Sequence, residues 1–115
     1  MRELKFRAFV EVNGKPLFTY SSDIGLLAFF RKFEYNKNIE QYTGLKDKNG
    51  EEIYEGDIVE YDWYIVGDKP AYRVEGQVVL DDLGARADGD RIRYCTNVEV
   101  IGNIHENPEL LKGEE

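Results

Sequence analysis

The chain has 115 residues, of which 42 % are hydrophobic, and this length and composition indicate a single globular domain rather than a disordered segment. It carries 23 acidic and 15 basic residues, and the formal net charge of −8 disfavours binding to the phosphates of nucleic acids. The single cysteine, Cys95, excludes an internal disulfide and a zinc site built from several cysteines. We expect one domain over residues 1–112, followed by a tail at residues 113–115.

The N-terminal segment predicts a β-hairpin. Over residues 4–12 apolar side chains occupy the even positions, which is the period of a strand with one buried face. Asn13 and Gly14 follow as a turn, since both tolerate positive φ, and residues 15–20 form the returning strand. Because this alternation contains no apolar run, the segment indicates neither a secretory signal nor a membrane span, and we expect a cytoplasmic protein.

The next segment is the candidate helix of the chain, over residues 22–34. Ser21 or Ser22 precedes it as a cap, and Asp23 lies in the first turn, where a negative charge complements the helix dipole. Apolar residues recur at helical spacing through the segment. Gly25 lowers its intrinsic helix propensity.

The middle of the chain predicts strands over residues 39–43 and 58–66, separated by glycine-rich turns. Alternation in the second strand places Ile58, Glu60, Asp62 and Tyr64 on one side, and Val59, Tyr61, Trp63 and Ile65 on the other. The second side is the more apolar. We therefore predict that Tyr61 and Trp63 belong to the core.

The C-terminal half predicts further strands, over residues 72–80, 91–96 and 98–104. The segment 81–90, which is rich in aspartate and glycine, predicts a mobile loop. Asn107 followed by Pro108 is typical of a helix start, so a short helical turn should follow β structure near the end of the chain. Short strands at close spacing predict a mostly β fold, either a barrel or a coiled sheet.

Three segments carry a resemblance to a known family: KFRAF at residues 5–9, QYTGLKDKNGEEIYEGDIV at residues 41–59, and VIGNIHENPEL at residues 100–110. Together they resemble the start, middle and end of the YopX family of bacteriophage and prophage proteins. The resemblance implies coiled β-sheets with an SH3-like barrel, in the cytoplasm of a bacterial host. It implies no activity.

The residue types that usually serve catalysis or metal binding do not form a recognisable pattern in this sequence. Ser21 and Ser22 are explained as helix caps, His105 as a packing residue, and Cys95 as a small buried hydrophobe on a strand next to that of His105. The DKNG segment at residues 47–50 lacks the spacing of a calcium loop. We therefore predict no catalytic residue, no metal and no cofactor, and we expect that the protein is not an enzyme.

Two classes of function remain, and the favoured one is a non-catalytic module that binds a phage or host protein. Its predicted partner surface is Tyr42, Tyr54 and Tyr64, since tyrosine is enriched in interface hot spots. The alternative is a small nucleic-acid-binding barrel that uses the basic stripe Arg2, Lys5 and Arg7 on the first strand. Self-association into a homo-oligomer is also expected, because small β domains have open strand edges.

Overall fold

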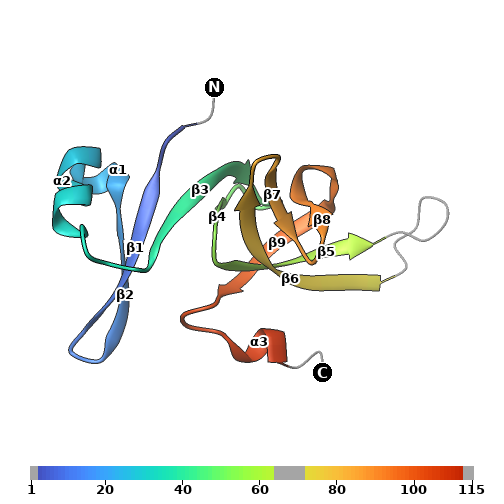
Figure 1. Ribbon diagram of the computed structural model, residues 1–115. Coiled ribbons are helices and arrows are strands. Elements are labelled where there is room, and N and C mark those ends of the chain that lie inside the picture. Colours follow the sequence, from blue (N-terminus) through green and yellow to red (C-terminus); the bar gives the residue numbers. More distant parts are fainter. Residues whose placement is uncertain (1–2, 64–71, 113–115) are drawn as a thin grey trace. The chain divides into compact units, whose positions relative to one another are not determined.

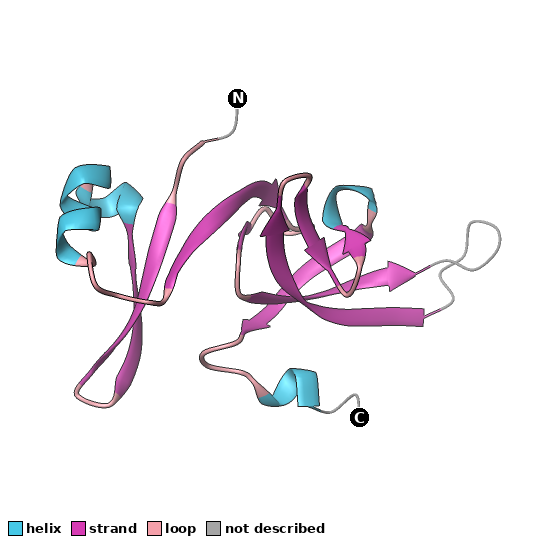
Figure 2. Ribbon diagram, in the orientation of Figure 1, coloured by secondary structure: helices cyan, strands magenta, loops and turns pink. Residues whose placement is uncertain are grey.

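Strands dominate the computed structural model, which describes residues 3–63 and 72–112 and has 54 % strand and 17 % helix (Figures 1 and 2). The predicted mostly β fold is confirmed. The chain forms two compact units, Met1–Tyr42 and Thr43–Glu115, each with its own hydrophobic core. The prediction of one domain over residues 1–112 did not anticipate this division and stays a prediction. None of the described helices is long and apolar enough to cross a membrane.

The first unit begins with the predicted hairpin. Strand β1 (Phe6–Val12) pairs antiparallel with β2 (Lys15–Tyr20), and Asn13 and Gly14 have φ of 53° and 76° in the turn between them. Strand β3 (Ile39–Lys46) pairs with the other side of β1 and continues into the second unit, where β4 (Glu52–Tyr54) completes a sheet of order β2-β1-β3-β4.

The predicted helix is present as two short helices, α1 (Ser21–Ile24) and α2 (Leu26–Lys32). They are separated at Gly25, whose φ of 86° interrupts the helix. The predicted serine cap is wrong. Ser21 is the first residue of α1 and its side chain is buried. Its hydroxyl accepts a hydrogen bond from the backbone N–H of Phe6 at 2.9 Å, which connects α1 to the first strand.

The second unit contains an antiparallel sheet of order β8-β7-β6-β5-β9, curled into a half-barrel. Its strands are β5 (Asp57–Trp63), β6 (Tyr72–Asp81), β7 (Gly84–Ala87), β8 (Asp90–Arg91) and β9 (Thr96–Asn103). A 3-10 turn, η1 (Ile92–Tyr94), precedes β9, and the helix α3 (Glu109–Lys112) follows it, close to its predicted place. Strand β5 lies between β6 and β9, and both Ile58 and Val59 on its opposite faces are fully buried.

Two predictions about residues 81–96 are wrong. The predicted mobile loop is the end of β6 followed by the β7–β8 hairpin, and the predicted strand 91–96 is interrupted by η1 between β8 and β9. The segment forms strands because its backbone pairs with β6, and the guanidinium of Arg91 also donates to both carboxylate oxygens of Asp81, at 2.6 and 2.8 Å. Asp88 and Gly89, with φ of 48° and 85°, form the tight turn between β7 and β8.

The turn between β3 and β4 covers part of the outer edge of β9. One carboxylate oxygen of Asp47 accepts the N–H groups of Asn49 and Glu51, each at 2.9 Å, and the other accepts that of Val100 at 3.0 Å. The N–H of Lys48 donates to the carbonyl of Val98 at 2.8 Å. The turn therefore satisfies backbone groups of β9 that an edge strand would leave open.

Candidate functional site

The predicted tyrosine surface is not exposed in the structure. Tyr42 is 4 % exposed and Tyr54 is 3 % exposed, so both rings are buried. Tyr64 lies outside the described residues. A buried ring offers no contact area to a partner, so the burial of these two rings speaks against the predicted partner surface, which stays a prediction.

The predicted basic stripe is also not an exposed row of charges. Arg7 is 5 % exposed, and its Nε donates to a carboxylate oxygen of Glu40 at 2.9 Å. The ammonium of Lys5 lies 3.6 Å from the carboxylate of Glu3. Arg2 lies outside the described residues. Neither Lys5 nor Arg7 presents a free cation to a phosphate.

The only cysteine and the only histidine lie at opposite ends of one strand rather than on neighbouring strands as predicted. Cys95 precedes β9 and His105 follows it, and a strand of this length spans about 25 Å. Burial, together with the charge of Asp90, raises the pKa of the Cys95 thiol to about 11. The thiol is therefore protonated at neutral pH, and these two residues form no catalytic dyad.

Aromatic rings gather where β5 ends and β6 begins. Trp63 and Tyr72 are partners across the antiparallel pair, and their rings stack with centroids 5.2 Å apart and planes 22° apart. Tyr72 is 52 % exposed and Trp63 is half-buried, whereas Tyr61 on the same strand is fully buried. The prediction of a core position is confirmed for Tyr61. Trp63 instead forms part of an accessible surface.

Carboxylates lie beside these rings. A pocket is lined by Trp63, Tyr72, Arg73, Val74, Glu75, Asp88 and Asp90, and we refer to it as the acidic–aromatic pocket. No ion pair joins Glu75, Asp88 or Asp90 to the residues that the structure describes. Asp90 is held in place by the hydroxyl of Tyr61, which donates to it at 2.6 Å. Burial and this hydrogen bond raise the pKa of Tyr61.

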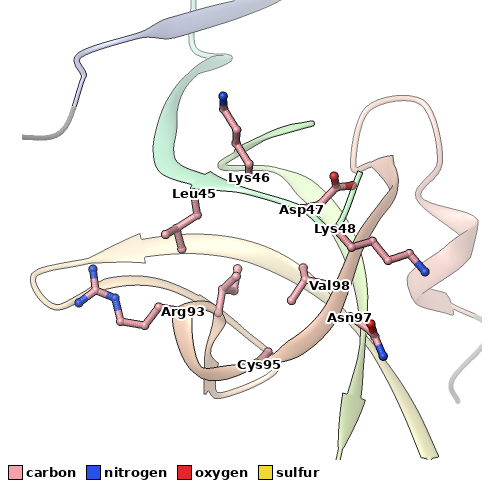
Figure 3. A pocket seen from close by; sticks show the side chains of 9 residues that line it. Leu45, Lys46, Asp47, Lys48, Arg93, Cys95, Asn97 and Val98 are labelled. Atoms are coloured by element: carbon pink, nitrogen blue, oxygen red, sulfur yellow. The ribbon is translucent and has the colours of Figure 1, made fainter. Parts of the chain in front are cut away.

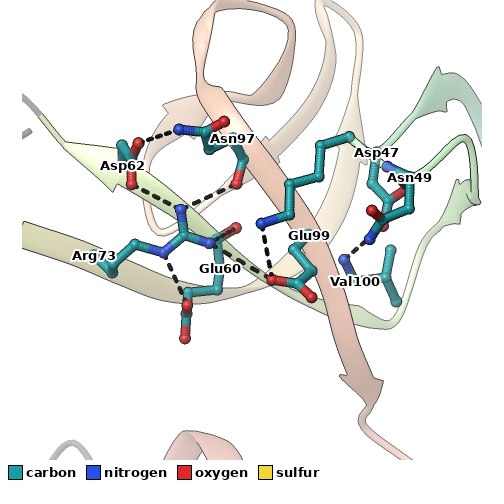
Figure 4. A network of polar contacts seen from close by, with 9 residues as sticks. Asp47, Asn49, Glu60, Asp62, Arg73, Asn97, Glu99 and Val100 are labelled. Atoms are coloured by element: carbon teal, nitrogen blue, oxygen red, sulfur yellow. Dashed lines mark hydrogen bonds and ion pairs between the residues drawn. The ribbon is translucent and has the colours of Figure 1, made fainter.

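Arg73, which lines the pocket, is the centre of a network of polar contacts (Figure 4). Its guanidinium donates to Glu60 at 2.8 Å, to Asp62 at 2.7 Å and to the carbonyl of Asn97 at 3.1 Å. These groups come from β5 and β9, so one side chain of β6 connects three adjacent strands. Hydrogen bonds from Arg73 and then Asn97 lower the pKa of Asp62, which therefore stays ionised at neutral pH.

This pocket was not predicted, although part of the signal for it is present in the sequence. Trp63 and Tyr72 flank the Gly-Asp-Lys-Pro break at residues 67–70, so a hairpin around that break would pair them. The carboxylates of Asp88 and Asp90 come from the segment that was predicted as a loop. Among the residues that the structure describes, no group of three or more histidine, cysteine, aspartate or glutamate side chains forms a possible metal site.

Comparison with known proteins gives one family. The YopX protein family matches residues 13–112, which is nearly the whole chain. A solved structure of protein EF1440 from Enterococcus faecalis is similar at 31 % sequence identity, covering 91 % of this chain and 74 % of that chain with a TM-score of 0.48. No curated protein matches.

Proposed function

Since the chain belongs to the YopX family, with residues 13–112 matched, we propose that it is a non-catalytic accessory protein of phage or prophage origin that binds another protein in the bacterial cytoplasm. The observation that carries this proposal is the acidic–aromatic pocket. Its lining combines carboxylates with aromatic rings, which are groups that bind cationic and apolar side chains of a partner.

The aromatic part of the pocket supports protein binding. Tryptophan, tyrosine and arginine are the residue types that most often dominate binding energy in protein interfaces, and Trp63, Tyr72 and Arg73 lie together here. The stack of Trp63 on Tyr72 is already formed, so binding requires little ordering of these two side chains.

The carboxylates favour a basic partner. Glu75, Asp88 and Asp90 form no ion pair with other described residues, and the whole chain has a net charge of −8. Complementary charge accelerates association with a positively charged segment and disfavours an acidic one. An arginine suits this pocket best, since its planar guanidinium stacks on aromatic rings and pairs with carboxylates.

The strand order of the second unit supports an SH3-like architecture for the half-barrel. Its last strand, β9, pairs with its first, β5, and a 3-10 turn leads into β9, an arrangement that resembles SH3-like barrels. Such barrels recognise peptides in grooves lined by aromatic side chains. A nucleic-acid-binding function through the basic stripe has less support, because Arg7 is buried against Glu40.

Fluorescence of Trp63 tests the proposal directly, because it is the only tryptophan of the chain and lines the pocket. Titration with a short peptide that contains three arginines should change this fluorescence to saturation. Tyr72→Ala should weaken the binding about tenfold or more, since it removes half of the stack. Host or phage proteins that the unmodified protein captures in a pull-down should not be captured by the Tyr72→Ala variant.

Tyr94→Ala is the matched control, because Tyr94 is 80 % exposed and does not line the pocket. It should bind the arginine peptide like the unmodified protein. A peptide in which glutamine replaces arginine should not bind. If Tyr72→Ala and Tyr94→Ala retain equal affinity, or if the glutamine peptide binds equally well, the pocket does not bind a basic partner.

Self-association is a further part of the proposal. Strand β2 lies at the edge of its sheet, and Leu17 on this strand is 50 % exposed. Pairing of two copies along such an edge would satisfy its open backbone groups. Light scattering should show a dimer that Leu17→Lys converts to a monomer, whereas a monomer over a wide concentration range would contradict the prediction.

A further inference from the structure

We propose that a second site, a cleft with a basic rim in the second unit, binds an acidic protein segment that inserts one aliphatic side chain. The cleft has a volume of about 310 Å³ and lies between residues 45–48, which end β3 and enter the next turn, and residues 92–98, which run from η1 into β9 (Figure 3). It shares no lining residue with the acidic–aromatic pocket, so the two sites can be tested independently.

The centre of the cleft is aliphatic. Leu45, Ile92 and Val98 line it together with Cys95, and all four side chains are buried or half-buried. The thiol of Cys95 donates to the carbonyl of Arg91 at 3.3 Å and is protonated, so it adds a weakly polar wall rather than a charge. A leucine or isoleucine side chain fits such a surface, and its burial is favourable in proportion to the apolar area removed from water.

The rim of the cleft is basic, although the protein as a whole is acidic. Lys46 and Arg93 are exposed and form no ion pair with residues in the described ranges 3–63 and 72–112. Lys48 also lines the cleft, and its ammonium lies 3.3 Å from the carboxylate of Glu99. Asp47 also lines the cleft, but its carboxylate is buried and accepts backbone N–H groups, so the exposed charges of the rim are positive. They select for a partner whose acidic groups meet these side chains.

The directions of the basic side chains indicate an extended ligand. Figure 3 shows that the charged ends of Lys46, Lys48 and Arg93 extend away from the aliphatic centre in different directions. A compact anion such as phosphate requires donors that converge on one point, which these do not. An extended chain with acidic residues on both sides of an apolar one would bring a carboxylate near each of them.

A peptide explains the cleft better than a nucleic acid does. Single-stranded nucleic acids bind by stacking their bases on aromatic rings, and none of the residues that line the cleft is aromatic. Their continuous phosphate charge is also repelled by the net charge of −8 more strongly than a short acidic segment is. The aliphatic centre has no role in binding phosphates, whereas it can hold one apolar side chain of a peptide.

Fluorescence anisotropy of a labelled peptide, acetyl-Glu-Glu-Leu-Glu-Glu-amide, tests the inference at about 0.1 M ionic strength, where surface charges still act over about 10 Å. We expect saturable binding to the unmodified full chain. The double variant Lys46→Glu, Arg93→Glu should weaken it about tenfold or more, since it reverses the two exposed charges of the rim. Replacing the peptide leucine with serine should also weaken it about tenfold, because the aliphatic contact is lost.

The matched control is the double variant Lys37→Glu, Arg31→Glu, which changes the net charge equally at exposed positions of the first unit. It should retain the affinity, and circular dichroism should show that both double variants are folded. The inference is overturned if the peptide does not bind, if both double variants lose the same affinity, or if the serine peptide binds equally well. It is also overturned if a single-stranded oligonucleotide binds more tightly than the peptide and is lost with the rim variant.

Discussion

Replacing Asp47 with alanine is expected to lower the free energy of unfolding by about 3 kcal/mol or more, because a buried charged acceptor of several hydrogen bonds is removed. Asp47 is 7 % exposed, and its carboxylate accepts the N–H groups of Asn49, Glu51 and Val100. Without it, these donors lose their partner, and the turn after β3 is no longer tied to β9. Urea denaturation followed by circular dichroism measures the effect.

Two further variants identify the cause of this loss. Asp47→Asn keeps one acceptor oxygen but places an amide donor toward N–H groups, so it should recover less than half of the lost stability. Asp82→Ala is the control, because Asp82 is an exposed aspartate in the turn after β6. Should Asp47→Ala and Asp82→Ala cost the same small amount, the turn does not depend on the carboxylate.

The stabilisation that Asp47 contributes is expected to depend on pH. Burial raises the pKa of Asp47, but the N–H donors of Val100, Glu51 and Asn49 and the charge of Lys48 outweigh it, so the pKa is lower than usual. A lowered pKa in the folded state stabilises the protein above the ordinary aspartate value of about 4. This contribution is lost as the pH falls through the folded pKa. The difference between Asp47→Ala and the unmodified protein should therefore be constant near neutral pH and shrink below about pH 4.

The sequence predicted those elements of the fold that depend on neighbouring residues. The β1–β2 hairpin follows from Asn13 and Gly14, whose own backbone preferences make the turn. The helical segment was recognised from its spacing, and Gly25 both weakened the prediction and divides the helix. Each of these features is local, so no knowledge of distant partners was needed.

Other elements depend on contacts between distant residues, which the sequence pattern does not contain. The segment 81–90 has the composition of a loop, yet it forms paired strands, and Arg91 and Asp81 form an ion pair across ten positions. Tyr42 and Tyr54 carry a polar group that suits a surface, and their burial is decided by how the surrounding strands pack. Composition alone predicted neither the strand pairing of the first segment nor the burial of these two rings.

The candidate sites were unpredictable for the same reason. The acidic–aromatic pocket combines residues 63, 72–75 and 88–90, and the cleft with the basic rim combines residues 45–48 with residues 92–98. Strand pairing brings these segments together, and the pairing partner of each strand was not known. Lys5 and Arg7, which the sequence did single out, are by contrast paired with carboxylates within the first unit, with Arg7 as the clearer example.

Replacing Arg7 with alanine is expected to destabilise the first unit by about 3–5 kcal/mol, since a buried carboxylate then loses its opposite charge. The side chains of Arg7 and Glu40 are 6 % and 9 % exposed, and their charged atoms lie 2.9 Å apart. The guanidinium also lies over the ring of Phe18, 4.2 Å from its centroid, so the substitution removes packing as well. Thermal unfolding followed by circular dichroism should show the loss, whereas Lys15→Ala, at an exposed position on β2, should have an effect within about 0.5 kcal/mol.

A double-mutant cycle separates the ion pair from the packing. Arg7→Met keeps the apolar stem over Phe18 but leaves Glu40 without this cation, and it should still be strongly destabilising. Adding Glu40→Met should recover at least half of that loss, because replacing both charges with apolar groups removes the cost of a buried charge. If Arg7→Met alone is neutral, the pair does not stabilise the unit.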